Sequence, residues 1–327
     1  MKNLEHEGIY NAWIQTFMKS AYADLKEIDS YDIAFIWIPA DYWASYRKWT
    51  SLAPKYVRQY SYWDGILWTK HYNLDEDILI HSSQYNICDL WDIHIMPTDL
   101  KWTTDRIEST IWLIASSNRA LPLIIWWDHS IAYHTIKWTL NALNLTGSKD
   151  VAILHFDAHT DVERDYIDMP RIYHGSPFRY LIEDGIILPE NLFTVGPRWV
   201  IPYDLIEFIK NNGINLFTMK HINDKGISLF FDTLIKKLET FKYIYITFDI
   251  DSIDPTEVKW TGTPLEGGFH VIDILSFFRK TKKLNIIGFE LVELAPELDL
   301  SWYSNMVACN ILWHFLSFWY KQKLLNL

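Results

Sequence analysis

Between Val151 and Asp161 the chain reads VAILHFDAHTD, a largely apolar run that is followed at once by acidic and imidazole side chains. Short, continuous apolar runs of this kind are typical of strands that are buried on both faces of a parallel sheet. In open α/β sheets, ligands bind beyond the carboxyl ends of the strands. This stretch therefore predicts an α/β protein with a functional site directly after residue 156.

The same pattern recurs along the chain, where apolar, β-rich runs alternate with helical patterns from about residue 120 onward. We expect strands at Leu121–Trp127, Val151–Phe156, Asn191–Val195, Asn215–Met219, Tyr243–Phe248 and Leu284–Leu291. We expect helices near residues 131–143, 202–211, 227–240 and 271–281. Two further runs, Asp32–Ile38 and Asp77–His81, should extend the same sheet on its N-terminal side. The alternation predicts a three-layer αβα fold with a mostly parallel sheet of about eight strands.

The length of 327 residues fits one large domain or two ordinary ones. No repeat, low-complexity segment or linker rich in Gly, Ser or Pro divides the chain, so we expect residues 1–327 to form a single domain. The N-terminal third, to about residue 103, is atypical, because 12 of the 17 tryptophans fall before residue 139. These aromatic side chains either pack the core and a long connection or form a wall that contacts a large substrate.

The chain is acidic, with 41 Asp and Glu residues against 30 Lys and Arg residues and a net charge of -11. A nucleic-acid-binding protein would normally carry the opposite sign, so we expect no nucleic-acid partner. The acidity suits cationic ligands or metal ions, but it is equally a common means of keeping a protein in solution. Whether the chain forms a homo-oligomer is left open by its sequence.

Cysteine content and hydrophobic runs indicate the compartment. Cys88 and Cys309 are the only cysteines, too few for a disulfide framework in so long a chain, so a reducing, cytoplasmic location is expected. Residues 1–7 lack the apolar run of a signal peptide. The most hydrophobic late stretch, Met306–Tyr320, is shorter than the roughly 20 residues needed to span a bilayer. It should form a buried C-terminal helix, and no membrane partner is expected.

Acidic residues and histidines follow three of the predicted strands. They are Asp128 and His129 after the first, Asp157, His159 and Asp161 after the second, and Asp249, Asp251 and Asp254 after the fifth. Each group alone could cap a turn, and Asp254, which precedes Pro255, is expected to do so. Because the carboxyl ends of parallel strands meet at one edge of a sheet, the three groups together predict a common site.

The spacing of these residues supports metal binding. In extended backbone, residues two apart lie on the same side, so Asp157, His159 and Asp161 should share a side, as should Asp249 and Asp251. Several carboxylates at one point would repel one another strongly unless cations lay between them. Mixed histidine and aspartate ligands suit Mn, Fe, Co or Zn, whereas purely oxygen ligands suit Mg or Ca. The pattern therefore predicts a transition-metal site.

Six segments in chain order resemble the signatures of the arginase/agmatinase (ureohydrolase) superfamily. They are DHS at 128–130, DAHTD at 157–161, HGSPF at 174–178, FDIDSIDP at 248–255, TGTP at 261–264 with Gly267-Gly268, and GFELVELAP at 288–296. The resemblance covers about residues 104–320. It implies an arginase-like fold and a hydrolase that cleaves a C–N bond of a guanidino group and releases urea.

The resemblance also implies two divalent metal ions, usually manganese, which together supply a hydroxide near neutral pH. One ion would be held by His129, Asp157, Asp161 and Asp249, and the other by Asp157, His159, Asp249 and Asp251. The resemblance further implies that Asp161 orients the hydroxide, that His174 carries a proton to the leaving amine, and that Glu293 pairs with the guanidinium. The plainer alternatives are that His174 is a loop histidine without a catalytic role and that Glu293 forms an ordinary ion pair at a strand end. Glu290 should lie behind the site.

Two departures from the family pattern concern the substrate. Trp126 and Trp127 stand where the family has two glycines, so this segment must follow another path or be braced by the two rings. The stretch Val162–Pro170 lacks the small polar residues with which arginases bind the α-amino and α-carboxylate groups of free arginine. In this respect the chain is similar to peptide arginases of ribosomal natural-product pathways, which convert arginine to ornithine within a peptide. The alternatives are a small substrate (arginine, agmatine or a formimino compound) and a non-catalytic metal-binding relative.

Overall fold

The computed structural model describes residues 15–39, 52–61, 70–74, 78–81, 86–117, 119–125, 128–164, 170–259, 261–296 and 301–325. Nine strands of this part form one sheet in the order β1-β5-β2-β6-β11-β10-β7-β8-β9, and every neighbouring pair is parallel. The strands are β1 Ala21–Tyr22, β2 Ile33–Trp37, β5 Ile87–Asp92, β6 Leu121–Ile125, β7 Val151–Phe156, β8 Leu192–Val195, β9 Asn215–Phe217, β10 Tyr243–Asp249 and β11 Ile286–Val292. The expected parallel sheet is confirmed, with one strand more than the sequence indicates.

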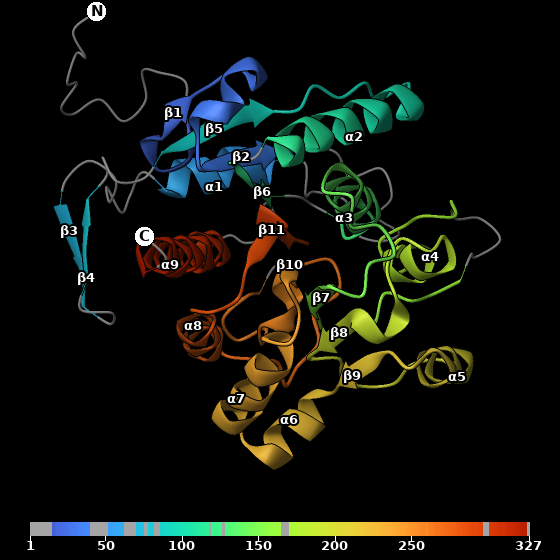
Figure 1. Ribbon diagram of the computed structural model, residues 1–327. Helices are drawn as coiled ribbons and strands as arrows, with labels where there is room; N and C mark the ends of the chain where they lie inside the picture. The colour runs from blue at the N-terminus through green and yellow to red at the C-terminus, as the bar shows by residue number, and fades with distance from the viewer. Residues whose placement is uncertain are drawn as a thin grey trace, which may run out of the picture.

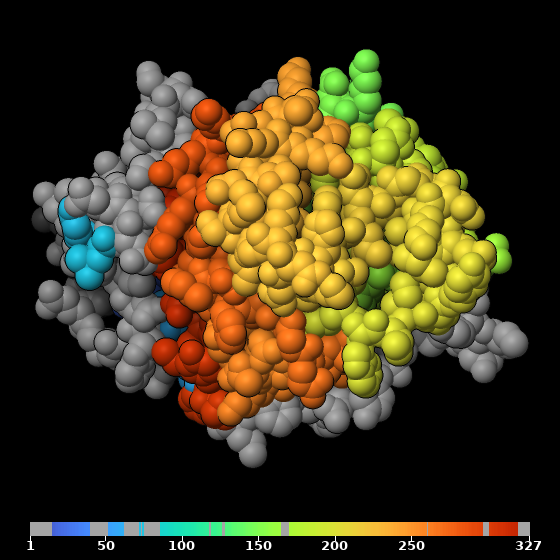
Figure 2. Space-filling model, turned by 90° about the horizontal axis from the view of Figure 1, so that it is seen from below, coloured from blue at the N-terminus to red at the C-terminus, as the bar shows by residue number. Residues whose placement is uncertain are grey.

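Helices cover both faces of the sheet (Figure 1). They are α1 Ala53–Ser61, α2 Leu100–Ser116, α3 Ile131–Ala142, α4 Pro177–Glu183, α5 Tyr203–Asn212, α6 Met219–Lys225, α7 Ile227–Leu238, α8 Val271–Lys280 and α9 Tyr303–Leu325. On one face α2 packs on α3 and α3 on α4, while on the other α7 packs on α8 and α8 on α9. The three-layer αβα architecture is therefore confirmed. Figure 2 shows the face formed by α6 and α7 (gold) and α8 (orange).

The carboxyl end of β7 is held by an aromatic core. Phe156, its last residue, packs against Phe248 of β10, Phe231 of α7 and Phe277 of α8, with ring centroids 5.0–6.5 Å apart. All four side chains are fully buried. Burying one phenylalanine contributes about 1.5–3 kcal/mol to folding, so this cluster fixes the strand end from which the acidic segment departs.

One predicted strand belongs to another sheet. The expectation that Asp77–His81 extends the main sheet is wrong, because β4 (Ile78–His81) pairs antiparallel with β3 (Lys70–Asn73) in a separate hairpin (Figure 1). Only four residues, three of them acidic, connect the two strands in the sequence. So short a connection favours pairing of the strands with each other. The sheet is instead extended beyond β2 by β5 and β1.

A second correction concerns Asn215–Met219, where the strand ends at Phe217. Thr218 caps α6, because its hydroxyl accepts a hydrogen bond from the backbone N–H of His221. A threonine in this position favours the start of a helix, which the alternating pattern of strands and helices did not indicate.

The late hydrophobic run forms α9, and its core-facing residues Ala308, Ile311 and Leu312 are fully buried, as expected. In the described ranges no helix combines the length and the apolar character that crossing a membrane requires.

The tryptophan-rich N-terminal third is described only in part. Trp37 of β2 is fully buried and packs against Phe17 and Phe35, so this tryptophan belongs to the core. Most of the aromatic stretch between Asp41 and Trp68 lies outside the described residues, as do Trp126 and Trp127.

Candidate metal centre

The predicted site residues meet at one edge of the sheet. Because β6, β11, β10 and β7 are parallel neighbours, their carboxyl ends lie side by side. His129 follows β6, Asp157 follows β7, Asp249 ends β10 and Glu293 follows β11. All four side chains are buried. Segments far apart in the sequence thus converge where open α/β sheets bind ligands.

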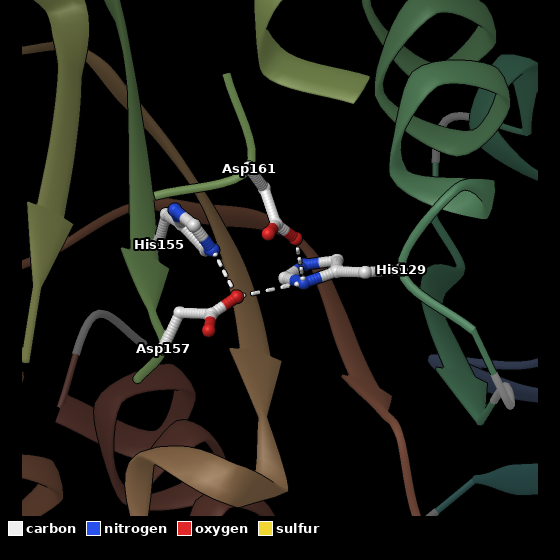
Figure 3. Close-up of side chains that lie close together, drawn as sticks. All are labelled: His129, His155, Asp157 and Asp161. Carbon is white, nitrogen blue, oxygen red and sulfur yellow. Dashed lines mark hydrogen bonds and ion pairs between the residues drawn. The ribbon is translucent and has the colours of Figure 1, made fainter. Parts of the chain in front are cut away.

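A first cluster surrounds the Nδ1 atom of His129 (Figure 3). Carboxylate oxygens of Asp157 and Asp161 each lie 2.9 Å from this atom, and an oxygen of Asp249 lies 3.4 Å away. His155 joins the cluster from within β7, because its Nε2 atom is 2.7 Å from Oδ2 of Asp157. His129, His155, Asp157 and Asp161 can all direct a ligand atom toward one cation.

A second cluster shares Asp157 with the first. The Nδ1 atom of His159 lies 3.3 Å from Oδ1 of Asp157 and 3.0 Å from Oδ2 of Asp251. These three residues can also hold a metal ion. Asp251 is oriented by two backbone contacts: its carboxylate accepts a hydrogen bond from Ala158 N at 3.0 Å, and its own N–H donates to Asp249 at 2.7 Å. Asp157 therefore lies between two adjacent ligand sets.

The backbone after β7 does not continue as a strand, which corrects the expectation that Asp157, His159 and Asp161 lie on one side. Asp161 has a φ of 48°, in the left-handed region that non-glycine residues seldom adopt. A hydrogen bond of 3.2 Å from Phe178 N to the Asp161 carbonyl helps to hold this conformation. As a result Asp161 faces His129, whereas His159 faces Asp251. The bend distributes the side chains between two clusters.

Burial and crowding change the ionisation of the acidic groups. Burial raises the pKa of Asp161 to about 7, and the charge of Asp157 adds to the rise. The pKa of Asp249 is raised well above its usual value by burial and by the charges of Asp251 and Asp157. Burial also acts on Asp157, but three neighbouring histidines outweigh it and hold the pKa well below its usual value. So many buried carboxylates call for cationic partners.

The imidazole and carboxylate groups of the two clusters are suitable ligands for such cations. Nδ1 of His129 is buried and forms no well-aligned hydrogen bond with any described residue, although two carboxylate oxygens lie only 2.9 Å away. A nitrogen facing several carboxylate oxygens in this way leaves a position suited to a cation. Mixed imidazole and carboxylate ligands are those that manganese, iron and zinc accept.

A buried polar layer lies behind His129. Its Nε2 atom is 2.8 Å from the hydroxyl of Thr247 on β10, and the two form a hydrogen bond. Glu290 on β11 accepts hydrogen bonds from Thr135 at 2.6 Å and from Tyr245 at 3.0 Å. Burial raises the pKa of Glu290, and hydrogen bonds, including one from Thr247, oppose the rise. Glu290 thus lies behind the cluster, as its place on the strand predicts.

A cavity of about 290 Å³ opens beside the two clusters. Asp161, His159 and Asp249 contribute to its wall, together with His174 and Glu293. Glu293 accepts a hydrogen bond of 2.9 Å from the backbone N–H of His129, and its Oε1 atom lies 4.0 Å from Nδ1 of His174. Burial, with the charge of Asp128 next, raises the pKa of Glu293 well above its usual value. Burial, with nearby His159 and His129, lowers the pKa of His174 to about 4.

Sequence reasoning missed four residues at this site: His155, Glu163, Arg198 and Thr247. His155 lies in β7 two residues before Asp157, so the spacing argument could have included it. The other three carry no local signal, because only the folded chain brings them to the cavity or behind His129. Asp254 caps a turn as expected, since its carboxylate accepts hydrogen bonds from the N–H groups of Thr256, Gly267 and Gly268.

Several known proteins are similar to this chain over most of its length. Proclavaminate amidinohydrolase of Streptomyces clavuligerus is 27% identical over 313 residues, which cover 92% of this chain and 91% of that protein. Agmatinase of Proteus mirabilis is 29% identical over 281 residues, covering 84% and 83%. The formimidoylglutamase structure from Bacillus subtilis has a TM-score of 0.81 at 25% identity, covering 96% of this chain and 95% of that one.

The profile of the arginase family matches residues 31–317, a range that includes every strand end of the two clusters. The fold agrees, since the structure of proclavaminate amidino hydrolase from Streptomyces clavuligerus superposes with a TM-score of 0.82 at 24% identity, covering 96% of this chain and 100% of that one. The expected superfamily, and with it the expected class of hydrolase acting on the C–N bonds of amidines, is confirmed. The chain belongs to the arginase family.

Proposed function

We propose that the two clusters hold a pair of divalent ions, manganese in the cell, and that the chain hydrolyses a guanidino group to release urea. The observation that carries the proposal is the convergence of both clusters, His174 and Glu293 on one cavity. The first ion would be held by His129, Asp157, Asp161 and Asp249, and the second by Asp157, His159, Asp249 and Asp251. Residues 1–327 would act as one domain.

When bound, such a pair of ions lowers the pKa of a shared water and so supplies a hydroxide near neutral pH. Side chains of the protein bind the substrate, orient the attacking oxygen and transfer the proton. Glu293 binds the guanidinium through a charge-assisted hydrogen bond, and Asp161 orients the attacking oxygen. The lowered pKa of His174 leaves its imidazole neutral near pH 7. Once it has taken up a proton, the same low pKa makes it a strong acid that can pass the proton to the leaving amine.

For the substrate we propose arginine within a peptide, which would become ornithine. Trp199 and Val200 are 81% and 84% exposed, and the cavity wall includes Arg198, Val200 and Ile201. An exposed apolar surface beside a cavity suits the residues that flank a peptidyl arginine. Val162, directly after the metal segment, is buried and apolar, and offers no side-chain clamp for an amino acid.

A small guanidino or amidino compound is the second candidate. It is favoured by the names of the relatives, which include guanidinobutyrase of Pseudomonas aeruginosa and formimidoylglutamase of Halalkalibacterium halodurans.

One experiment separates these functions. The manganese-loaded protein is incubated with free arginine, with agmatine and with a blocked arginine-containing peptide, and urea is measured in each reaction. We expect urea from the peptide, with ornithine in the product found by mass spectrometry. Rapid urea release from arginine or agmatine and none from the peptide would exclude the peptide assignment. A metal-loaded protein that releases no urea from any of them would be a non-catalytic relative.

The hydrogen bond between Thr247 and His129 leads to a prediction about metal affinity. Replacing Thr247 by Val keeps the shape of the side chain but removes the partner of the imidazole Nε2 atom. We expect manganese to bind about 10–100-fold more weakly, because the imidazole is then less well oriented. Equilibrium dialysis measures the change. Thr110→Val on α2, where the hydroxyl bonds only a helix carbonyl, is the control and should keep the wild-type affinity.

Trp199 provides a test of peptide binding. Trp199→Ala should reduce kcat/KM for the peptide about tenfold, as expected when an aromatic contact to a partner is lost. The value for agmatine should stay within about twofold, because agmatine is too short to reach an exposed side chain outside the cavity. Trp112→Ala, which removes a half-exposed tryptophan from α2, should change neither value. Equal losses for peptide and agmatine would contradict a peptide-binding role of Trp199.

A further inference from the structure

Acidic side chains outnumber arginine and lysine side chains in the described part of the cavity wall. The wall contains the carboxylates of Asp161, Glu163, Asp249 and Glu293. Arg198 is the only arginine or lysine among the described residues of this wall. Asp161 and Asp249 belong to the metal clusters, and Glu293 lies beside His174. Glu163 is therefore the one carboxylate of the wall that neither the clusters nor the proposed reaction employs.

Arg198 cannot serve as a carboxylate receptor, because its guanidinium is engaged by the backbone. Its nitrogens donate hydrogen bonds of 2.7–3.5 Å to the carbonyl oxygens of Gly196, Asp251, Ser252, Leu265 and Glu266. These bonds engage all three guanidinium nitrogens and join the segment after β8 to the two loops after β10. A substrate carboxylate in the cavity would thus find no free guanidinium or ammonium group on the described residues.

Glu163 is held in place at the wall. The hydroxyl of Tyr173, a fully buried residue, donates a hydrogen bond of 2.5 Å to its Oε2 atom. The backbone N–H of Glu163 donates to the carbonyl of Gly175 at 2.8 Å. A Cβ atom at Gly175 would lie 2.9 Å from Oε2 of Glu163, so the carboxylate packs closely against the loop that carries His174. Its other oxygen, Oε1, receives no hydrogen bond from the residues that the structure describes.

We propose that this cavity selects guanidino substrates whose far end carries no carboxylate, and that Glu163 is the residue that sets this preference. The inference rests on the proposed guanidino hydrolase function and narrows its substrates. A carboxylate near Glu163 meets a like charge, and the described wall offers it no free arginine or lysine as a partner. Unpaired like charges of this kind are used at binding sites to exclude wrong partners. An amide, as in a peptide, carries no charge, and an amine would be attracted. Peptidyl arginine and agmatine-like amines therefore fit, whereas free arginine and guanidino acids do not.

The wild-type protein provides the first test. With manganese bound, kcat/KM is measured for L-arginine and for L-arginine amide, which differ only in the carboxylate. We expect the amide to be cleaved about 100-fold more efficiently, the order of discrimination that one unpaired like-charge contact supports. Equal efficiencies would overturn the proposal and leave the guanidino hydrolase function intact. This comparison does not depend on any variant being folded.

The second test assigns the preference to a residue. Glu163→Gln retains the shape and the acceptor for Tyr173 but removes the charge, so the preference for the amide should fall about tenfold. Glu190→Gln, at an exposed position outside the cavity wall, makes the same change of net charge and should keep the wild-type preference. An unchanged preference in Glu163→Gln would refute the role of Glu163.

A failure of the proposed hydrolase function can be distinguished from a failure of the proposed selectivity. If no substrate yields urea, the proposed hydrolysis is wrong. The dissociation constants of arginine and arginine amide, measured by calorimetry on the manganese-loaded protein, then decide the selectivity directly. We expect the amide to bind more tightly than arginine, and equal binding would overturn the inference.

Discussion

Replacing Asp157 by Asn should remove both metal binding and urea release. Among the described residues Asp157 belongs to both clusters, and it is, with Asp249, one of the two residues proposed to hold both ions. Its Oδ2 atom lies 2.9 Å from His129 Nδ1 and its Oδ1 atom 3.3 Å from His159 Nδ1, so each oxygen serves a different ligand set. Asparagine offers only one acceptor oxygen and no charge. Loss of several kcal/mol of electrostatic stabilisation corresponds to a fall of about a thousandfold or more in kcat.

Metal analysis of the purified protein checks this directly. We expect about two manganese ions per chain in the wild type, as in a two-metal site, and fewer than about one in Asp157→Asn. Asp150→Asn is the matched control, because Asp150 is exposed and precedes the opposite end of the same strand. It should retain both the metal and the activity. A variant at Asp157 that keeps its full metal content would refute the assignment of this residue as the shared ligand.

The largest effect on stability is expected from Arg58→Met in the N-terminal third. The Arg58 side chain is 2% exposed and forms ion pairs with Asp89 at 3.2 Å and Asp92 at 2.8 Å. Its guanidinium also lies over the rings of Trp37 and Trp91, 4.3 and 4.2 Å from their centroids. Removing the cation leaves the fully buried Asp89 without its charge partner. Breaking a buried pair in this way costs about 3–5 kcal/mol of unfolding free energy.

Urea denaturation followed by tryptophan fluorescence measures the loss. Arg119→Met is the control, because Arg119 also pairs with an aspartate, Asp32, at 2.7 Å, but its side chain is 49% exposed. Exposed pairs contribute about 0–1 kcal/mol, so this variant should be nearly as stable as the wild type. If both variants lose the same free energy, the buried cluster around Arg58 does not contribute to stability as proposed.

Much of the sheet and of the candidate metal centre could be predicted from local sequence. β7 and β10 are largely apolar runs, because strands buried on both faces need apolar side chains at most positions. Residues at or soon after the carboxyl ends of parallel strands lie along one edge of the sheet, which explains why His129, Asp157 and Asp249 could be predicted to lie close together. The hairpin of β3 and β4 was misplaced because a strand pattern does not reveal its pairing partner.

Other features depend on contacts between distant segments. No pattern indicates that Asp161 adopts a left-handed backbone, and it is this bend that directs Asp161 to His129 while His159 faces Asp251. In the sequence Thr247 is an ordinary strand residue, and only the fold places its hydroxyl 2.8 Å from Nε2 of His129. Glu163 and Arg198 have local sequences without a ligand-binding signal, and they acquire a role only by sharing the cavity wall.

The sequence by itself determined the parallel α/β class, the family and the residues able to bind metal, because apolar runs and ligand-bearing motifs are local properties of the chain. Only the tertiary structure decided how the ligands divide between two clusters, which groups support them, and that Arg198 is engaged while Glu163 carries an unmatched charge. Charge and hydrogen-bond balance at a site depends on distances of a few ångströms between residues remote in sequence, and those distances are set by folding.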